Sequence, residues 1–322
     1  MSENLQSGSN LVLAADLGGT HLRVALVNDH GEILAHVKRP TPRDDNPEVI
    51  VNALIDGARE CGANDRFAGL VRSASIMVPG AVDMKSAVVV QAPNLPSLKN
   101  FALKDALEKK LRLSVLLEND ANAAAVGEMW MGAARGYRSV ICVTLGTGVG
   151  GGIILDGQLW RGAHGTAGEI GHTTVDPHGT VKCKCGNTGC LEMFASATAI
   201  VRMTKELRAT IGDSKLNFDR LTAANVFEAG VNGDVLALEV FKRVGSYLGI
   251  GLANLINLLD PEIIVIAGGA VNGWSLFEKD MHAEVNERAF KASVAKVKIA
   301  QAECGDNAGL LGATRLALDL LN

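Results

Sequence analysis

Three of the six cysteines lie close together, with a histidine upstream of them. His172, Cys183, Cys185 and Cys190 form the pattern H-x10-C-x-C-x4-C. Zinc prefers four tetrahedral nitrogen and sulfur ligands, and one histidine with three cysteines is a common structural set. A disulfide or free thiols are the alternatives, but three cysteines leave one unpaired. We therefore predict a zinc ion that holds a loop in place, because a fully coordinated zinc cannot activate a water molecule.

A carboxylate that could act as a base lies at Asp120, within the sequence Glu-Asn-Asp-Ala-Asn at 118–122. A strand-like run at 114–117 precedes it, and a helical pattern follows up to residue 134. A carboxylate at such a junction can serve as a general base. It can also cap the helix, since Asp and Asn are common at that position. Spacing alone leaves both roles open and favours the cap.

Two glycine-rich loops could bind phosphate. One reads DLGGT at 16–20, and the other reads TLGTGVGG at 144–151. Backbone N–H groups without side chains can approach phosphate oxygens closely, and Asp16 could bind Mg²⁺ or its waters. Ordinary turns of β-hairpins are the alternative. The matching placement of the two loops favours phosphate binding.

The second loop also satisfies G-x-G-x-x-G, through Gly146, Gly148 and Gly151. That motif binds dinucleotides only where a strand runs into a helix. Here apolar residues 152–155 continue as a strand towards a turn at Asp156 and Gly157, which argues against a dinucleotide site. The chain contains no G-x-x-x-x-G-K-[ST] loop, and no H-R-D or D-F-G follows, so Walker-type and protein-kinase sites are excluded.

The elements that must position these residues repeat along the chain. Three strands are expected at 11–17, 22–28 and 32–38, with a glycine loop between the first two and a tight turn between the second and the third. The same order returns at 139–145, at 150–155 and from Gln158 onwards. Two α/β lobes that pack across a central cleft follow from this duplication. Their boundary is expected near 118–122, ahead of the helical stretch that ends at residue 134. No Pro- or Ser-rich linker separates the lobes, which favours their packing across a cleft.

Helical patterns complete each expected lobe. Apolar residues recur at helical spacing at 47–61 and 98–111, and again in a long segment at 233–259. A buried strand at 263–266 leads to a third glycine turn at Gly268 and Gly269, and a helix at 305–321 closes the chain. We assign 11–119 to a small lobe that 305–322 completes. The large lobe is assigned 120–304, with the zinc loop at 172–190.

Composition excludes several classes of protein. The 322 residues are 48% hydrophobic, which argues against disorder, and their net charge is −4 with no basic tract. Nucleic-acid binding is therefore not expected. The first ten residues are polar and carry no signal-peptide pattern, and the longest apolar stretch, 248–271, is interrupted by polar residues. We expect a cytoplasmic protein without membrane contact.

At this point the sequence resembles a known family. DLGGTHLRVALVN at 16–28 is similar to the first phosphate motif of the actin-like ATPase and sugar-kinase superfamily. TLGTGVGGGIILDGQLWRGAHGTAGEIGH at 144–172 resembles the signature of its ROK family (repressors, open reading frames and kinases). The resemblance covers 11–318, including GDNAGLLGATRLAL at its end, and within the family it is greatest to bacterial ATP-dependent glucokinases.

The resemblance implies an actin-like, ribonuclease H-like fold and transfer of phosphate from Mg-ATP to the 6-hydroxyl of glucose. It implies that Asp120 is the general base, which reverses the preference for a cap. It also implies a structural zinc and a homodimer. The sugar would contact Gly80, Asn94, Asn119, Asp120, Glu169, His172 and Glu192. The nucleotide would contact Asp16, Gly18, Gly19, Thr20, Thr144, Gly146, Thr147, Gly148, Gly150, Gly268 and Gly269.

The choice of sugar rests on fewer residues. Glu169 favours glucose, because N-acetylmannosamine kinases of the family can carry His there; kinases for N-acetylglucosamine, fructose or mannose are further alternatives. The segments 75–77, 86–87 and 97–98 depart from the family pattern and bear on sugar preference. A sugar-sensing repressor of the family would need a DNA-binding module, and only about ten residues precede the first expected strand. We therefore expect an enzyme.

Overall fold

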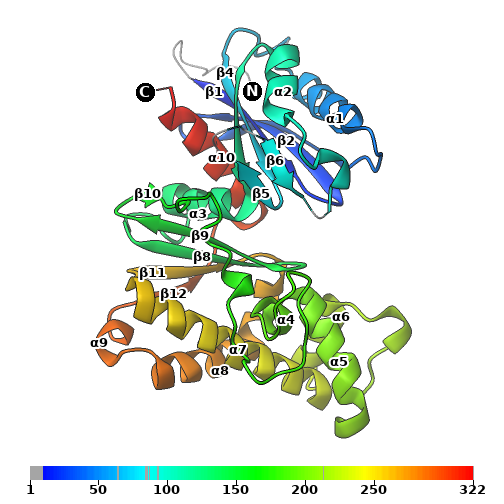
Figure 1. Cartoon of the computed structure of the whole chain (residues 1–322), viewed down its shortest axis with the longest axis vertical. Coiled ribbons are helices and arrows are strands. Elements are labelled where there is room, and N and C mark those ends of the chain that lie inside the picture. Colours follow the sequence, from blue (N-terminus) through cyan, green and yellow to red (C-terminus); the bar gives the residue numbers. More distant parts are fainter. Residues whose placement is uncertain are drawn as a thin grey trace.

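The computed structural model describes residues 10–63, 65–83, 86, 88–92, 94–212 and 214–321. The polar start of the chain, Ala87 and Pro93 of the family motifs, and the final residue Asn322 lie outside these ranges. The described chain forms two α/β lobes, one above the other in Figure 1, and each is built on a five-stranded sheet.

The sheet of the small lobe has the order β3-β2-β1-β4-β7. Its strands are β1 (Leu11–Leu17), β2 (His21–Asn28), β3 (Ile33–Pro40), β4 (Val71–Val78) and β7 (Ser114–Asn119). The first three form the antiparallel meander that the sequence predicts, and β4 and β7 add parallel to β1. A separate two-stranded sheet, β5 (Ala81–Asp83) and β6 (Val88–Gln91), follows β4.

The sheet of the large lobe repeats this plan in the order β10-β9-β8-β11-β12. Its strands are β8 (Val140–Leu145), β9 (Val149–Leu155), β10 (Gln158–Leu159), β11 (Ile263–Ala267) and β12 (Lys298–Gln301). Strands β8 and β9 are antiparallel and pair Leu145 with Val149, so the glycines between them form a hairpin turn. This pairing confirms that the G-x-G-x-x-G pattern does not lead into a helix.

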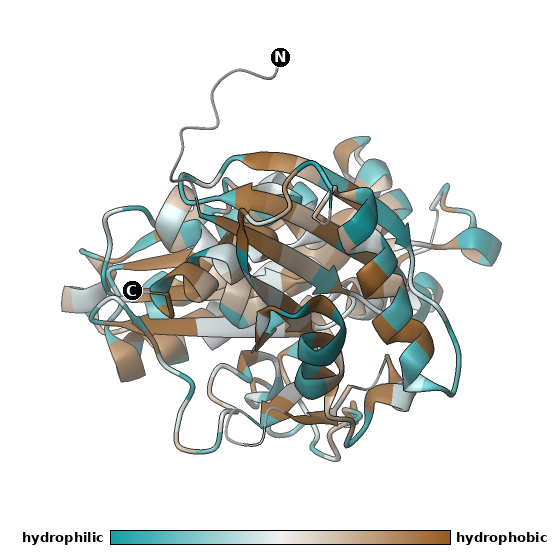
Figure 2. Cartoon of the chain, turned by 90° about the horizontal axis from the view of Figure 1, so that it is seen from above, coloured by the Kyte–Doolittle hydropathy of each residue, from teal (hydrophilic) through white to brown (hydrophobic). Residues whose placement is uncertain are grey.

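Helices cover both sheets. Helices α1 (Pro47–Glu60) and α2 (Leu103–Leu111) pack on one face of the small-lobe sheet. The far face of the large-lobe sheet carries a helical layer with α4 (Glu192–Ala195), α5 (Ala197–Ile211), α6 (Ala223–Val231), α7 (Val235–Leu259), α8 (Trp274–Arg288) and α9 (Lys291–Val294). Figure 2 shows hydrophobic strands in the interior and hydrophilic residues on many outer turns and loops, as amphipathic packing requires.

Two helices lie between the sheets and join the lobes (Figure 1). They are α3 (Asp120–Met131), which packs on the large-lobe sheet, and α10 (Ala308–Asp319), which packs on the small-lobe sheet. A Cβ on Gly127 would lie 1.9 Å from the Ala308 carbonyl oxygen, and one on Gly312 would lie 1.7 Å from that of Ala123. Glycine at both positions therefore allows the two backbones to approach closely.

A buried carboxylate fixes the end of α3 to the segment before α10. Glu128 is fully buried and accepts hydrogen bonds from the backbone N–H groups of Ala133, Glu303 and Cys304, at 2.9–3.1 Å. Charged side chains are rarely buried unless they are satisfied in this way. These hydrogen bonds fix the end of α3 against the segment that leads from the large-lobe sheet to α10.

The main differences from the predicted elements are at boundaries. The helix expected at 98–111 begins at Leu103, because Pro96–Leu98 forms a separate 3-10 turn and Asn100 adopts a left-handed conformation with φ 57°. The strand expected from Gln158 is only two residues long. Helices α5, α6 and α8 and strand β12 were not predicted.

Candidate active site

A cavity of about 440 Å³ lies where the two sheets and α3 meet. The two glycine turns line it from opposite lobes, together with the end of β4, the junction of β7 and α3, and the loop before His172. The predicted residues in its lining are Gly18, Gly19, Gly80, Asn94, Asn119, Asp120, Thr144, Gly146, Thr147, Gly148, Gly150, Glu169, His172, Glu192 and Gly268. Folding thus brings together residues that are up to 250 positions apart in the sequence, from Gly18 to Gly268.

The junction of β7 and α3 separates the cap from the candidate base. Asn119 is the N-cap residue of α3, and its Oδ1 accepts hydrogen bonds from the N–H groups of Ala121 and Asn122. Asp120 is therefore the first residue of the helix and not its cap. Its Oδ1 accepts from the Ala121 N–H at 2.9 Å, which orients the carboxylate without using Oδ2.

The Asp120 side chain retains solvent-accessible surface, which opens into the cavity, while protein atoms of both lobes surround its carboxyl group. Burial raises the pKa of Asp120 to about 6. The negative charge of Asp16 raises this pKa further, and that of Glu169 adds a smaller effect. The Ala121 N–H opposes these effects, because it stabilises the charged form. A carboxylate with such a pKa is ionised at neutral pH and accepts a proton more readily than an ordinary aspartate.

Asp16, at the end of β1, does not line this cavity. Its Oδ2 accepts hydrogen bonds from Nε and Nη2 of Arg23, with a distance of 3.0 Å to Nε. Arg23 also donates to the carbonyl oxygen of Asp306, at the start of the C-terminal segment. Among the described residues, Asp16 Oδ1 has no hydrogen-bond donor. One carboxylate oxygen is thus available towards the site.

The turn of the second hairpin is fixed from the large lobe. The Gly146 carbonyl oxygen accepts from the Ala197 N–H at 2.8 Å, and that of Thr147 accepts from the Thr198 hydroxyl at 2.7 Å. Both donors belong to the first turn of α5. Glu192 Oε2 accepts from the Val149 N–H at 3.1 Å, so this predicted sugar ligand contacts the phosphate hairpin directly.

The other predicted sugar ligands also line the cavity. The Asn119 amide nitrogen donates to the Gly80 carbonyl oxygen at 3.1 Å, which joins β7 to the turn after β4. Glu169 Oε2 lies 3.8 Å from His172 Nε2, and both side chains are partly exposed to the cavity. Carboxylate, amide and imidazole groups gathered in this way can donate to and accept from several hydroxyl groups.

Besides Asp16, two predicted nucleotide ligands lie outside this lining. Thr20 borders a neighbouring cavity of about 750 Å³, which Gly19, Asn94 and Thr147 also line. Gly269 begins the 3-10 turn Gly269–Gly273, directly after Gly268.

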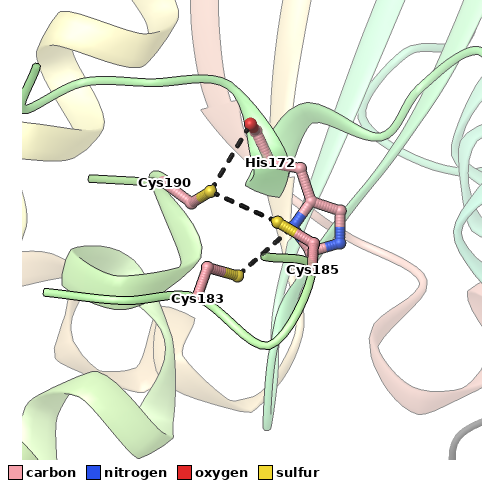
Figure 3. Close-up of side chains that lie close together, drawn as sticks. All are labelled: His172, Cys183, Cys185 and Cys190. Carbon is pink, nitrogen blue, oxygen red and sulfur yellow. Dashed lines mark hydrogen bonds between the residues drawn. The ribbon is translucent and has the colours of Figure 1, made fainter. Parts of the chain in front are cut away.

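The predicted metal ligands come together beside His172. The ligand atoms of His172, Cys183, Cys185 and Cys190 all lie within 4.8 Å of one another (Figure 3). His172 Nδ1 lies 3.6 Å from Cys183 Sγ, and the sulfur atoms of Cys185 and Cys190 are 3.7 Å apart. A tetrahedral zinc with ordinary bond lengths separates its ligands by about 3.6 Å (N to S) and about 3.8 Å (S to S). The donor set therefore fits a tetrahedral metal, and it uses the ring nitrogen of His172 that faces away from Glu169.

Two charged residues were missed by sequence reasoning. Glu118 is 1% exposed and forms an ion pair with Arg161, with 2.7 Å between Arg161 Nη2 and Glu118 Oε2. Glu118 ends an otherwise apolar run at 115–117, and a charge at the end of a buried strand is the signal that could have identified it. Nothing in the local sequence pairs it with Arg161, 43 residues later.

Comparison with known proteins gives matches over almost the whole chain. The model of the ROK family matches residues 12–320. A glucokinase from Halalkalibacterium halodurans is 37% identical over 93% of this chain and 92% of its own length. A xylose repressor from Caldicellulosiruptor bescii is 32% identical over 97% of this chain and 79% of its own length.

A solved structure matches equally well. A ROK family glucokinase from Streptomyces griseus, in complex with glucose and AMPPNP, superposes with a TM-score of 0.80. It is 35% identical and covers 96% of this chain and 100% of its own. The two-lobed, actin-like fold expected from the sequence is confirmed. Among the described residues, no helix combines the length and the apolar character needed to cross a bilayer.

Proposed function

This chain belongs to the ROK family, and from that premise we propose that it is an ATP-dependent glucokinase that forms glucose 6-phosphate. The observation that carries the proposal is the position of Asp120, a carboxylate with a raised pKa in a cavity that both glycine hairpins line. Full-length similarity to glucokinases, one of them bound to glucose and AMPPNP, supports the same substrates.

In the proposed reaction, phosphoryl transfer depends on positioning and on neutralising charge, as in other kinases. The backbone N–H groups of the turns at Gly18–Gly19 and Gly146–Gly148 would hold the phosphates from opposite lobes. Gly268 would border the adenosine. Asp16 Oδ1 would bind Mg²⁺ or its waters, and bound Mg²⁺ supplies charge neutralisation at the phosphates.

Asp120 would accept the proton of the sugar 6-hydroxyl as its oxygen attacks the terminal phosphorus. Its orientation by the Ala121 N–H and its raised pKa both support this role. Glu169, His172 and Asn119, with Gly80, Asn94 and Glu192 near them, would bind the other hydroxyl groups. Each of these contacts would orient the ring so that only the 6-hydroxyl reaches Asp120.

The Cys₃His cluster would bind a structural zinc ion. With Nδ1 of His172 on the metal, Nε2 faces Glu169 and the cavity, at 3.8 Å from Glu169 Oε2. The second nitrogen of a metal-bound histidine ordinarily donates a hydrogen bond. His172 would therefore donate to a sugar hydroxyl from a fixed position. Family membership also supports a homodimer, which light scattering on the purified protein can test.

A second candidate is a sugar-binding protein without turnover, which the 32% identity to a xylose repressor favours. An ATP-coupled assay with glucose, mannose, fructose, N-acetylmannosamine and N-acetylglucosamine separates the two. We expect ADP release with glucose to exceed that with the other four sugars. Release that is greater with another sugar would identify a different hexose kinase, and binding without ADP release would favour the repressor-like protein.

A further inference from the structure

We infer that Glu118 and Arg161 form a positioning pair that places the proposed sugar-binding loop, residues 161–172, against the proposed base Asp120. This inference rests on the proposed sugar-kinase function for its catalytic consequence. The contact itself is a property of the fold. Neither side chain lines the cavity, so both are positioning residues and not catalytic ones.

Four hydrogen-bond donors converge on the Glu118 carboxylate. Its Oε1 accepts from the Asn119 N–H and the Asn122 amide nitrogen, each at 3.0 Å. Its Oε2 accepts from Arg161 Nε at 2.8 Å and from Nη2 at 2.7 Å. The carboxylate thus receives four donors, two on each oxygen. An uncharged amide has one acceptor oxygen, so it could satisfy only the donors on one side.

The donors to Glu118 belong to two different elements. Asn119 and Asn122 flank Asp120 at the start of α3. Arg161 begins the segment that runs from β10 to the 3-10 turn Ile170–His172. That segment carries Glu169 and His172, two of the predicted sugar ligands of the large lobe. One carboxylate therefore joins the surroundings of the base to the loop that would hold the sugar.

Two contacts tether the loop at its beginning: the Trp160 N–H donates to the Ile153 carbonyl oxygen of β9 at 2.8 Å, and the Arg161 side chain pairs with Glu118. Among the described residues, the Arg161 guanidinium donates hydrogen bonds only to Glu118, and the backbone carbonyl oxygen of Arg161 accepts from the Ala167 N–H at 3.0 Å, within the same loop. At its far end the loop is fixed by the Cys₃His cluster. The Glu118–Arg161 pair thus fixes the first end of the loop, as the metal ligands fix the second.

A buried ion pair is a poor means of stabilising a fold, since apolar residues of similar volume are often equally good. The pair does fix the relative orientation of the two segments that carry it, because the planar guanidinium meets the carboxylate in a defined geometry. Displacement of a substrate-positioning element by about 1 Å can lower activity by about 100-fold. Placement of the loop is therefore the property that this pair would contribute.

The test uses Glu118→Gln, Arg161→Gln and the double variant, with Glu128→Gln as the matched control. Glu128 is an equally buried carboxylate at the other end of α3, and its hydrogen bonds come from the backbone N–H groups of Ala133, Glu303 and Cys304, outside the cavity. Glucose KM and ATP KM are measured separately, and hydrogen–deuterium exchange is followed in peptides covering 161–172.

Both single variants should raise glucose KM by about 10- to 100-fold and leave ATP KM nearly unchanged. The double variant should be no worse than the more impaired single one, because the two side chains act as a unit. Exchange in 161–172 should accelerate in all three. The Glu128→Gln control should lose thermal stability with glucose KM and loop exchange unchanged.

Unchanged exchange at 161–172 in both single variants would overturn the inference, as would equal acceleration in the Glu128→Gln control. If Glu118→Gln does not fold, Arg161→Lys provides the same test, since it keeps the charge and loses the two-donor geometry. The exchange measurement does not need activity. A wild-type protein without sugar-kinase activity would therefore refute the proposed function and leave this result interpretable.

Discussion

The two glycine turns occupy equivalent places in two sheets of the same strand order, yet the carboxylates beside them are used differently. Asp16, beside the small-lobe turn, pairs with the guanidinium of Arg23. Glu192, beside the large-lobe turn, accepts a hydrogen bond from a backbone N–H of the hairpin itself. Among the described residues, one oxygen of each carboxylate has no hydrogen-bond donor, but Glu192 also helps to shape its own turn, whereas Asp16 is oriented by the ion pair with Arg23.

The difference extends to what surrounds each turn. The large-lobe turn is fixed by the start of α5 and lies near the loop that carries the metal ligands. The small-lobe turn is fixed within its own lobe, where Thr41 donates to the Gly18 carbonyl oxygen at 2.6 Å. Asp120 belongs to neither hairpin, since it lies at the junction between the lobes. Duplication therefore provides the two turns proposed to bind phosphate, and residues outside the repeat provide the proposed base and the proposed sugar ligands.

The largest effect is expected at that junction. Asp120→Asn keeps the size of the side chain and removes the base, so kcat should fall by about 10²- to 10⁴-fold. Glucose affinity, measured by calorimetry, should change little, because the other sugar ligands remain. Turnover close to that of the wild type would exclude Asp120 as the base.

The next effect should distinguish the two hairpin carboxylates. Asp16→Asn removes a charge from the proposed Mg²⁺ site and should lower kcat by about 100-fold, with a higher Mg²⁺ requirement. Glu192→Gln keeps an acceptor for the Val149 N–H and should lower kcat by less than about 10-fold. Equal losses in the two variants, measured across a Mg²⁺ titration, would contradict the asymmetry.

Loss of the metal should affect the sugar side more than the nucleotide side. Cys190→Ala removes a buried ligand and should raise glucose KM by about 10- to 100-fold, with ATP KM nearly unchanged. Elemental analysis should find about one zinc per wild-type chain and none in the variant. A wild-type protein without zinc, or a variant in which only ATP KM rises, would refute the structural role of the cluster.

A smaller effect is expected on the pH profile. Because Asp120 must be ionised to accept a proton, kcat/KM should fall as the pH drops through about 6, the pKa of this carboxyl. The charge of Asp16 contributes to the raised value, so Asp16→Asn should move the acidic limb of the residual activity to lower pH. A limb that moves to higher pH would contradict this electrostatic link between the small-lobe hairpin and the base.

The smallest effect concerns stability. The pKa of Asp120 is raised from 3.8 to about 6, so the folded state binds this proton more tightly than the unfolded chain does. The stability gained from protonation is present below about pH 4 and is lost as the pH rises through 6. Asp120→Asn should therefore have a Tm at pH 8 equal to or above that of the wild type. A clear decrease in Tm would show that the carboxylate is stabilising instead.

Much of this arrangement could be predicted from local patterns. The meander around residues 16–20 and its repeat at 144–151 are formed by neighbouring strands, so alternating apolar runs and glycine turns are sufficient to identify them. The Cys₃His cluster could be predicted equally well, because three of its four members lie within eight residues, from Cys183 to Cys190.

What could not be predicted depends on contacts between distant segments. The Glu118–Arg161 pair joins elements from different lobes, and the contact of Glu192 with Val149 depends on how α4 packs. The cap on α3 was ambiguous because Asn119 and Asp120 are both good capping residues, and only the backbone conformation assigns that position to Asn119. The identity of the sugar could not be predicted from local patterns either, since its proposed ligands come from several distant elements.

The central claim is that the cavity around Asp120 transfers phosphate from ATP to the 6-hydroxyl of glucose. ³¹P NMR of the wild-type protein with Mg-ATP and glucose tests it most directly. We expect a new resonance of glucose 6-phosphate that grows as the terminal phosphate signal of ATP declines. Inorganic phosphate as the only new signal, or phosphate on another hydroxyl of the sugar, would contradict it.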